Sequence, residues 1–171
     1  MSPTAKRAHL IAGVVTFVRA AQRLPGITRI ALIGSLTTNK ADPKDADLLV
    51  AVTDDIDLAS LAKLTRKLRG HAQTINRGGE VFLVDPRNKY LGRICPWKQC
   101  APGIRMSCDA LHCGRREYLH DDLKDVTLAQ SLLDAPPLEL WPQVVVRVPV
   151  PQDIEQDLLM PIKGEKPREG R

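Results

Sequence analysis

The sequence predicts an α/β (α+β) fold, in which a small mixed sheet is flanked by helices. Apolar residues recur at helical spacing over the first twenty or so residues. Three short aliphatic and β-branched runs follow, separated by turn residues, as is typical of strands. A second amphipathic helix pattern lies between the last two runs. Helix, strand, strand, helix and strand in this order indicate a layered α/β protein whose loops carry the polar chemistry.

The composition is that of a basic globular protein. The chain has 171 residues, which is enough to bury a core without disulfides or metals. Aromatic residues make up only 4%, so Leu, Val, Ile and Ala must fill that core. The net charge of +5 favours polyanionic partners such as nucleotides or nucleic acid.

The N-terminal segment is expected to be an amphipathic helix, although its start resembles a signal peptide. Lys6 and Arg7 precede an apolar stretch, as in a secretion signal. The helical pattern nevertheless continues to Leu24, and Pro25-Gly26 ends it. No run approaches the ~18 apolar residues of a transmembrane helix. We therefore expect a helix, no membrane association and a cytoplasmic location.

A core of three strands and a second helix is expected within residues 1–88. Asp57 is suited to cap the helix, and Gly70 to end it. The strands are continuous apolar runs, as buried strands are. They are expected over residues 27–33, 47–52 and 80–84.

The second half of the chain has weaker patterns. Residues 89–120 are expected to form an irregular Cys-rich module that binds a metal. Residues 121–150 are expected to contain a helix over 121–133 and a strand over 144–150. Residues 151–171 are charged and interrupted by prolines, which predicts a flexible tail.

Two aspartates stand at the start of the second expected strand. Asp45 and Asp47 are at positions i and i+2, so their side chains share one face of that strand. Like charges this close repel each other unless a cation lies between them. Mg²⁺ binds one or two carboxylates together with substrate phosphate oxygens. The pair therefore predicts a Mg²⁺ (or Mn²⁺) site.

A Gly-Ser turn ends the first expected strand, nine residues before this pair. Gly34 lets the backbone approach a phosphate closely, and Ser35 adds a hydroxyl donor beside exposed N–H groups. Lys44 adds positive charge nearby. The stretch therefore predicts a triphosphate cradle that faces a metal-binding carboxylate pair. The alternative interpretation is that Asp45 and Asp47 belong to a solvated acidic turn.

These residues resemble the signature of the DNA polymerase beta-type nucleotidyltransferase superfamily. The resemblance rests on Gly34-Ser35, the spacer and Asp45-Ala46-Asp47-Leu48, and it extends to the order of elements in the core. It is strongest to the small, minimal members. It implies transfer of a nucleoside monophosphate from an NTP such as ATP, with Mg²⁺ ions on the two aspartates. Pro43-Lys44 stands where the family often has Ser before the first Asp.

The resemblance also implies a third catalytic carboxylate on the next core strand. Glu80 is the preferred residue, because an apolar run follows it as one follows Asp47. Asp85, at the end of that strand, is the alternative. The implied role is to bind a metal and to activate the attacking hydroxyl.

Four cysteines fall within nineteen residues, namely Cys95, Cys100, Cys108 and Cys113. In a cytoplasmic chain, clustered thiolates indicate a metal site more readily than disulfides. We expect Zn²⁺, and an Fe–S cluster is the second interpretation. His112 and His120 are substitute ligands. The remaining interpretation is that the cysteines are reduced and pack as small apolar residues.

The sequence thus predicts a Mg²⁺-dependent nucleotidyltransferase that binds an NTP. Its acceptor stays open between RNA, protein and a small molecule. Basic residues among the cysteines, such as Arg93 and Arg116, form either an RNA-binding surface or an ordinary solvated one. One alternative is a non-catalytic, antitoxin-like module of the same fold that binds a protein partner. The other is a zinc-dependent RNA-binding protein whose acidic motif is incidental.

Overall fold

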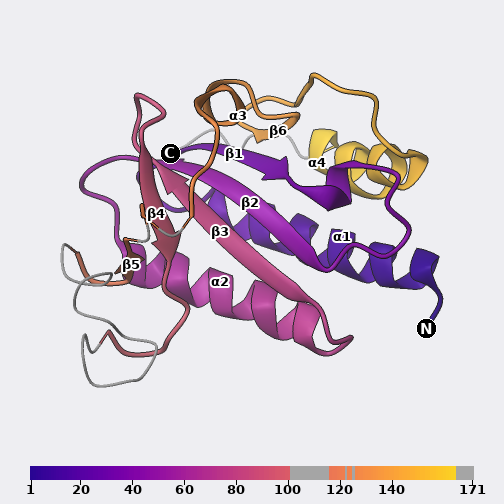
Figure 1. Ribbon diagram of the computed structural model, residues 1–171, viewed down its shortest axis with the longest axis horizontal. Coiled ribbons are helices and arrows are strands. Elements are labelled where there is room, and N and C mark those ends of the chain that lie inside the picture. The colour runs from indigo at the N-terminus through magenta and orange to yellow at the C-terminus, as the bar shows by residue number, and fades with distance from the viewer. Residues whose placement is uncertain (101–115, 122, 125, 165–171) are drawn as a thin grey trace.

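The computed structural model describes residues 1–100, 116–121, 123–124 and 126–164. Their strands form one seven-stranded sheet (Figure 1). The strands are β1 (Ile27–Ile33), β2 (Asp45–Val52), β3 (Gly78–Val84), β4 (Tyr90–Ile94), β5 (Leu119–His120), β6 (Leu138–Trp141) and β7 (Val145–Val146). They are ordered β5-β4-β3-β2-β1-β6-β7, and only the β2–β3 pair is parallel. The prediction of a mixed α/β fold is confirmed.

Two long helices, α1 (Pro3–Ala21) and α2 (Leu58–Gln73), cover one face of this sheet (Figure 1). Ser2 caps α1 by accepting a hydrogen bond from the Ala5 N–H at 3.1 Å. Asp57 caps α2 by accepting one from the Ala59 N–H at 3.0 Å. The apolar stripes of both helices pack on alternate strand residues and form the main core. Among the described residues, no helix combines the length and hydropathy needed to cross a membrane.

The opposite face of the sheet is only partly covered. A smaller apolar cluster there includes Leu49, Val84 and Leu133, the last from the short helix α3 (Gln130–Asp134). Side chains alternate along a strand, so Asp47 lies on the same face as Leu49. Asp47 and Glu80 are half-buried on this face, while Asp45 is exposed. The open part of the sheet therefore carries the carboxylates.

The predicted core elements agree with the structure except at their ends. The strand over 27–33 coincides with β1. The strands β2 and β3 each begin two residues earlier than predicted, because the parallel pairing starts with Asp45 opposite Gly78. The helix α2 continues past Gly70, where a methyl group would meet open space.

Both described ends of the Cys-rich segment belong to the sheet. The expected irregular structure is wrong for residues 90–94, because β4 pairs with β3 through Phe82 opposite Arg93. The strand β5 in turn pairs with β4. Gly92, at φ 126°, interrupts the alternation of apolar and polar side chains that would have indicated a strand. The core thus continues past residue 88.

The expected helix over 121–133 is also wrong for much of its length. The helix α3 spans only Gln130–Asp134, since Ala129 before it is extended. Extended backbone there brings Leu128 as well as Leu132 against the smaller apolar cluster. The expected strand over 144–150 is confirmed only for Val145–Val146, which form β7 at the edge of the sheet. This strand pairs with β6, an unpredicted strand that lies beside β1.

The expected flexible tail is helical in its described part. A π-helix, η2 (Ile154–Leu159), leads into α4 (Met160–Lys163), and both pack on α1 (Figure 1). Three apolar side chains of η2 are fully buried, and they are Ile154, Leu158 and Leu159. Burial of these three side chains stabilises the segment, although its charged, proline-interrupted composition had predicted a flexible tail. Residues 165–171 lie outside the described part.

Candidate active site

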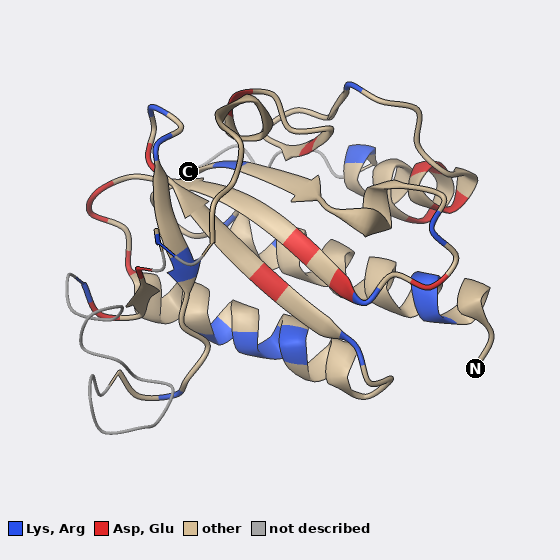
Figure 2. Cartoon of the chain, in the orientation of Figure 1, with Lys and Arg blue, Asp and Glu red and all other residues tan. Residues whose placement is uncertain are grey.

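Three carboxylates from β2 and β3 lie together on the open face of the sheet. Asp47 is in direct register with Glu80 across the parallel pairing. Asp45 precedes Asp47 by two residues and so shares its strand face. Figure 2 shows the acidic stretches of the two strands side by side in the middle of the sheet. The structure thus brings together the three residues predicted to be catalytic.

Asp85, the alternative third carboxylate, lies at the other end of β3. Its Oδ1 accepts hydrogen bonds from the backbone N–H groups of Arg87 at 2.8 Å and Lys89 at 2.9 Å. These bonds hold the turn that joins β3 to β4. Because β2 and β3 run parallel, this end is remote from Asp45 and Asp47. Of the two residues, Glu80 is the one that neighbours the pair.

The carboxylates repel one another. Burial, together with the nearby charges of Asp45 and Glu80, raises the pKa of Asp47 to about 7. Among the described residues, neither the Asp45 nor the Asp47 side chain makes a hydrogen bond or ion pair. Glu80 forms an ion pair with Arg93, at 3.8 Å between Oε1 and Nη1. The pair on β2 is therefore a place where a cation would be stabilised.

The Gly-Ser turn approaches this pair closely because it lacks a side chain at its first position. Gly34 has φ 78°, a conformation that favours glycine. A Cβ atom there would lie 2.8 Å from Asp47 Oδ2. The 3-10 helix η1 (Ser35–Thr37) follows, and Thr37 Oγ1 donates to the Gly34 carbonyl at 2.7 Å. The turn and the carboxylate therefore face each other, as the sequence predicted.

Lys44, the third residue assigned to phosphate binding, is engaged elsewhere. Its Nζ forms an ion pair with Asp42 Oδ2 at 3.0 Å. Asp42 Oδ1 also forms an ion pair with Arg77 Nη2 at 2.5 Å. The hydrogen bonds from Arg77 and Lys44 lower the pKa of Asp42 to about 2. The Lys44 ammonium is thus held by the loop before β2.

The carboxylates of Asp45 and Asp47 fit a metal ion whose remaining ligands come from a bound phosphate group and water. Within the described ranges, no three His, Cys, Asp or Glu side chains enclose an ion by themselves. Mg²⁺ at phosphate sites takes one or two carboxylates and completes its shell with phosphate oxygens and water. Asp45 and Asp47, on an open face beside the Gly34 turn, match that incomplete set. They do not match a closed protein cage.

The cysteine site is described only in part. Cys108, Cys113 and His112 lie outside the described residues. Cys95 is buried at the end of β4, and its N–H donates to the Tyr118 carbonyl at 2.7 Å. Cys100 is half-buried, and its Sγ accepts a hydrogen bond from the Tyr118 N–H at 3.4 Å. The zinc assignment stays a prediction.

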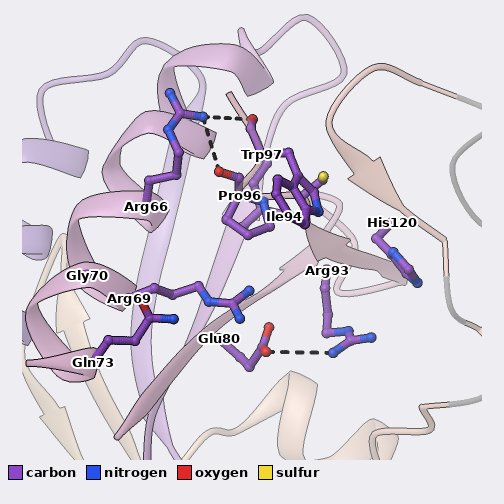
Figure 3. Close-up of a pocket in the computed structure, with 11 residues that line it drawn as sticks. Arg66, Arg69, Gly70, Gln73, Glu80, Arg93, Ile94, Pro96, Trp97 and His120 are labelled. Carbon is purple, nitrogen blue, oxygen red and sulfur yellow. Dashed lines mark hydrogen bonds and ion pairs between the residues drawn. The ribbon is translucent and has the colours of Figure 1, made fainter. Parts of the chain in front are cut away.

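A cavity of about 500 Å³ opens beside Glu80. It lies between α2 and the strands β3 and β4, and the basic side chains in its wall are Arg66, Arg69 and Arg93 (Figure 3). Sequence reasoning did not assign this cavity. The one available signal was the spacing of Arg66, Arg69 and Gln73, which places them on one face of a helix.

Arg7 is a further residue that no motif marks. Its side chain is 8% exposed and forms a two-pronged contact with Asp153, at 2.7 Å and 3.0 Å. It also donates to the carbonyls of Leu36, at 3.1 Å, and Lys40, at 2.9 Å. Arg7 therefore ties α1 and the C-terminal helices to the segment that follows the Gly-Ser turn.

Comparison with known proteins gives one match. Residues 1–121 match the sequence model of DUF6932, a family of unknown function. The matched range contains the three carboxylates, the Gly-Ser turn and the cavity. No curated protein and no solved structure matches the chain. Because the match covers more than half of the sequence, the chain belongs to the DUF6932 family.

Proposed function

We propose that the protein is a Mg²⁺-dependent nucleotidyltransferase of the DNA polymerase beta type. One observation carries this proposal: Asp45, Asp47 and Glu80 share an open sheet face beside a glycine turn. The raised pKa of Asp47 supports it, because perturbed carboxylates concentrate at functional sites. The substrate is an NTP such as ATP.

Each part of the site has a role in this proposal. The backbone N–H groups and hydroxyl of the Gly34-Ser35 turn bind the triphosphate. Asp45 and Asp47 hold Mg²⁺ or Mn²⁺. When bound, the metal neutralises phosphate charge and orients the attacking and leaving oxygens. Two unpaired carboxylates opposite an anion-binding turn are suited to that task.

The reaction displaces pyrophosphate. An acceptor hydroxyl oxygen forms a bond to the α-phosphorus, and the bond from this phosphorus to the bridging oxygen of the β-phosphate breaks. Glu80 accepts the hydroxyl proton. Glu80 suits this role because it borders both the carboxylate pair and the basic cavity.

The test is transfer of label from α-³²P NTPs, with Mg²⁺ or Mn²⁺, to RNA, protein and small-molecule fractions. A double variant, Asp45→Asn with Asp47→Asn, removes both charges with little change of shape. Asp54→Asn is the matched control, because Asp54 is an exposed aspartate beyond the end of β2. We expect label with the wild type and the control and none with the double variant. Absence of transfer by folded wild type to every fraction would contradict the proposal.

A further inference from the structure

The cavity beside Glu80 is basic, and its arginines are held in different ways. Arg66 Nη1 donates to the carbonyls of Trp97 at 2.9 Å and Pro96 at 3.3 Å, which ties α2 to the chain after β4 (Figure 3). Arg93 is paired with Glu80. The Arg69 side chain makes no hydrogen bond or ion pair with any described residue. The cavity therefore offers at least one guanidinium that is available to a ligand.

The geometry places these charges around Glu80. Figure 3 shows Arg69 and Arg93 pointing toward Glu80 from opposite sides. Glu80 is the only acidic residue in the cavity wall among the described residues. Three guanidinium groups against one carboxylate leave the cavity strongly positive. An anionic ligand is therefore attracted, and its approach leads toward the carboxylate cluster.

The shape and chemistry favour nucleic acid among anions. A guanidinium group matches a phosphate with two parallel hydrogen bonds. A volume of about 500 Å³ is much larger than one phosphate group. Trp97 lines the cavity and is 45% exposed, so part of its ring surface is open to stacking by a base. Phosphate-binding groups beside an exposed aromatic ring are typical of sites for single-stranded nucleic acid.

We propose that this cavity binds the acceptor, a single-stranded nucleic acid whose backbone phosphates contact Arg66, Arg69 and Arg93. Its terminal hydroxyl then lies toward Glu80, the residue assigned to accept the proton. The proposal that nucleic acid binds in the cavity depends only on these contacts. The proposal that this nucleic acid is the acceptor rests on the proposed transferase function. RNA and DNA share the phosphate chemistry, and the experiment below separates them.

The test measures binding of a short fluorescent single-stranded RNA, and of DNA of the same sequence, by anisotropy over a range of salt. Arg69→Glu reverses a charge in the cavity. Lys67→Glu is the matched control, because Lys67 is exposed on the same helix but borders the groove between α1 and α2. Thermal unfolding of each variant verifies that it is folded. An acidic peptide serves as a competitor.

We expect Arg69→Glu to weaken binding about tenfold and to reduce the salt slope by about 1, and Lys67→Glu to have a much smaller effect. Three phosphate contacts give the wild type a slope of about −2. Whichever of RNA and DNA binds more tightly is identified as the ligand. Equal binding by the wild type and Arg69→Glu would overturn the proposal. Displacement by the acidic peptide as readily as by RNA would also overturn it.

The double variant Asp45→Asn/Asp47→Asn separates this proposal from the transferase function. If the wild type transfers no label but RNA binding depends on Arg69, the cavity stands as a nucleic-acid site and the transferase function fails. If label passes to a protein or small molecule and Arg69→Glu does not reduce the transfer, the transferase stands and the cavity proposal is wrong. If both hold, the double variant binds RNA and transfers nothing.

Discussion

Asp47 and Glu80 are direct cross-strand neighbours on the parallel strands β2 and β3, and both side chains lie on the open face of the sheet. Like charges in direct opposition destabilise a sheet. Asp45 adds a third carboxylate to the same row. Burial of Asp47, and then the charges of Asp45 and Glu80, raise the pKa of Asp47, so its ionised form costs folding free energy in the absence of a cation. A bound divalent cation would remove this cost.

Asp47→Asn is expected to stabilise the metal-free protein at alkaline pH. The pKa of Asp47 is about 7 in the fold against 3.8 in the unfolded chain, so the folded state binds the proton more tightly. The contribution of Asp47 to stability is therefore greatest below about pH 4, and it falls until the pH passes about 7. The shift corresponds to at most about 4 kcal/mol, since one pKa unit is about 1.4 kcal/mol.

Urea unfolding in EDTA measures this effect. We expect Asp47→Asn to exceed the wild type in stability near pH 8, and the difference to vanish near pH 4. Asp54→Asn serves again as the exposed control. A wild type as stable as Asp47→Asn near pH 8 would show that burial and repulsion do not destabilise the ionised form of Asp47.

Gly34→Ala is expected to destabilise the protein by about 1–3 kcal/mol, since a side chain at φ 78° is strained. The added methyl group also meets Asp47 Oδ2 at 2.8 Å, so the carboxylate must move. Gly70→Ala is the contrasting control. Nothing lies within 4 Å of a methyl group there, and alanine is expected to stabilise α2 by about 0.5–1 kcal/mol. Denaturant unfolding of both variants checks the opposite signs, and equal signs would contradict the description of the turn.

Arg7→Ala is expected to cost about 3–5 kcal/mol, because it leaves Asp153 and two carbonyls without a buried partner. The neighbouring Lys6→Ala removes only a 4.0 Å contact of a partly exposed lysine with Asp42, and about 1 kcal/mol or less is expected. Unfolding free energies measure both. Amide hydrogen exchange of residues 36–40 should also rise in the folded Arg7→Lys variant. Unchanged exchange there would show that Arg7 does not hold this segment.

The purified protein is expected to contain one zinc ion per chain, bound by Cys95, Cys100, Cys108 and Cys113. Elemental analysis after purification without added metal measures the content. A Cys100→Ser variant should lose zinc, because one of four thiolate ligands is removed. Iron and inorganic sulfide in place of zinc would instead indicate an Fe–S cluster. A folded wild type free of both would show that the cysteines are reduced apolar residues.

The core and its carboxylates were largely predictable because their signals are local. A continuous apolar run marks a buried strand wherever it packs, so β1, β2 and β3 were found, and spacing alone puts Asp45 and Asp47 on one face. Whether Glu80 or Asp85 joins them depends on the register of β3. That register is set by the length and packing of α2, which no local pattern reports.

Other features depend on partners distant in the sequence. Arg7 and Asp153 are 146 residues apart, and neither position has a motif around it. Pro151 precedes the C-terminal helices and Pro161 lies in the first turn of α4, and these helices are ordered by packing on α1. The cavity likewise forms only when α2 and β4 are placed side by side.

The most direct test of the central claim is calorimetric binding of a non-hydrolysable NTP with Mg²⁺, which needs no knowledge of the acceptor. At pH 7 about half of the Asp47 side chains carry a proton, so binding should release protons, and buffers of different ionisation enthalpy reveal them. We predict Mg²⁺-dependent binding with proton release in the wild type and in Asp54→Asn, and neither in Asp45→Asn/Asp47→Asn. Binding of the same strength without Mg²⁺, or undiminished in the double variant, would contradict a metal-binding carboxylate site.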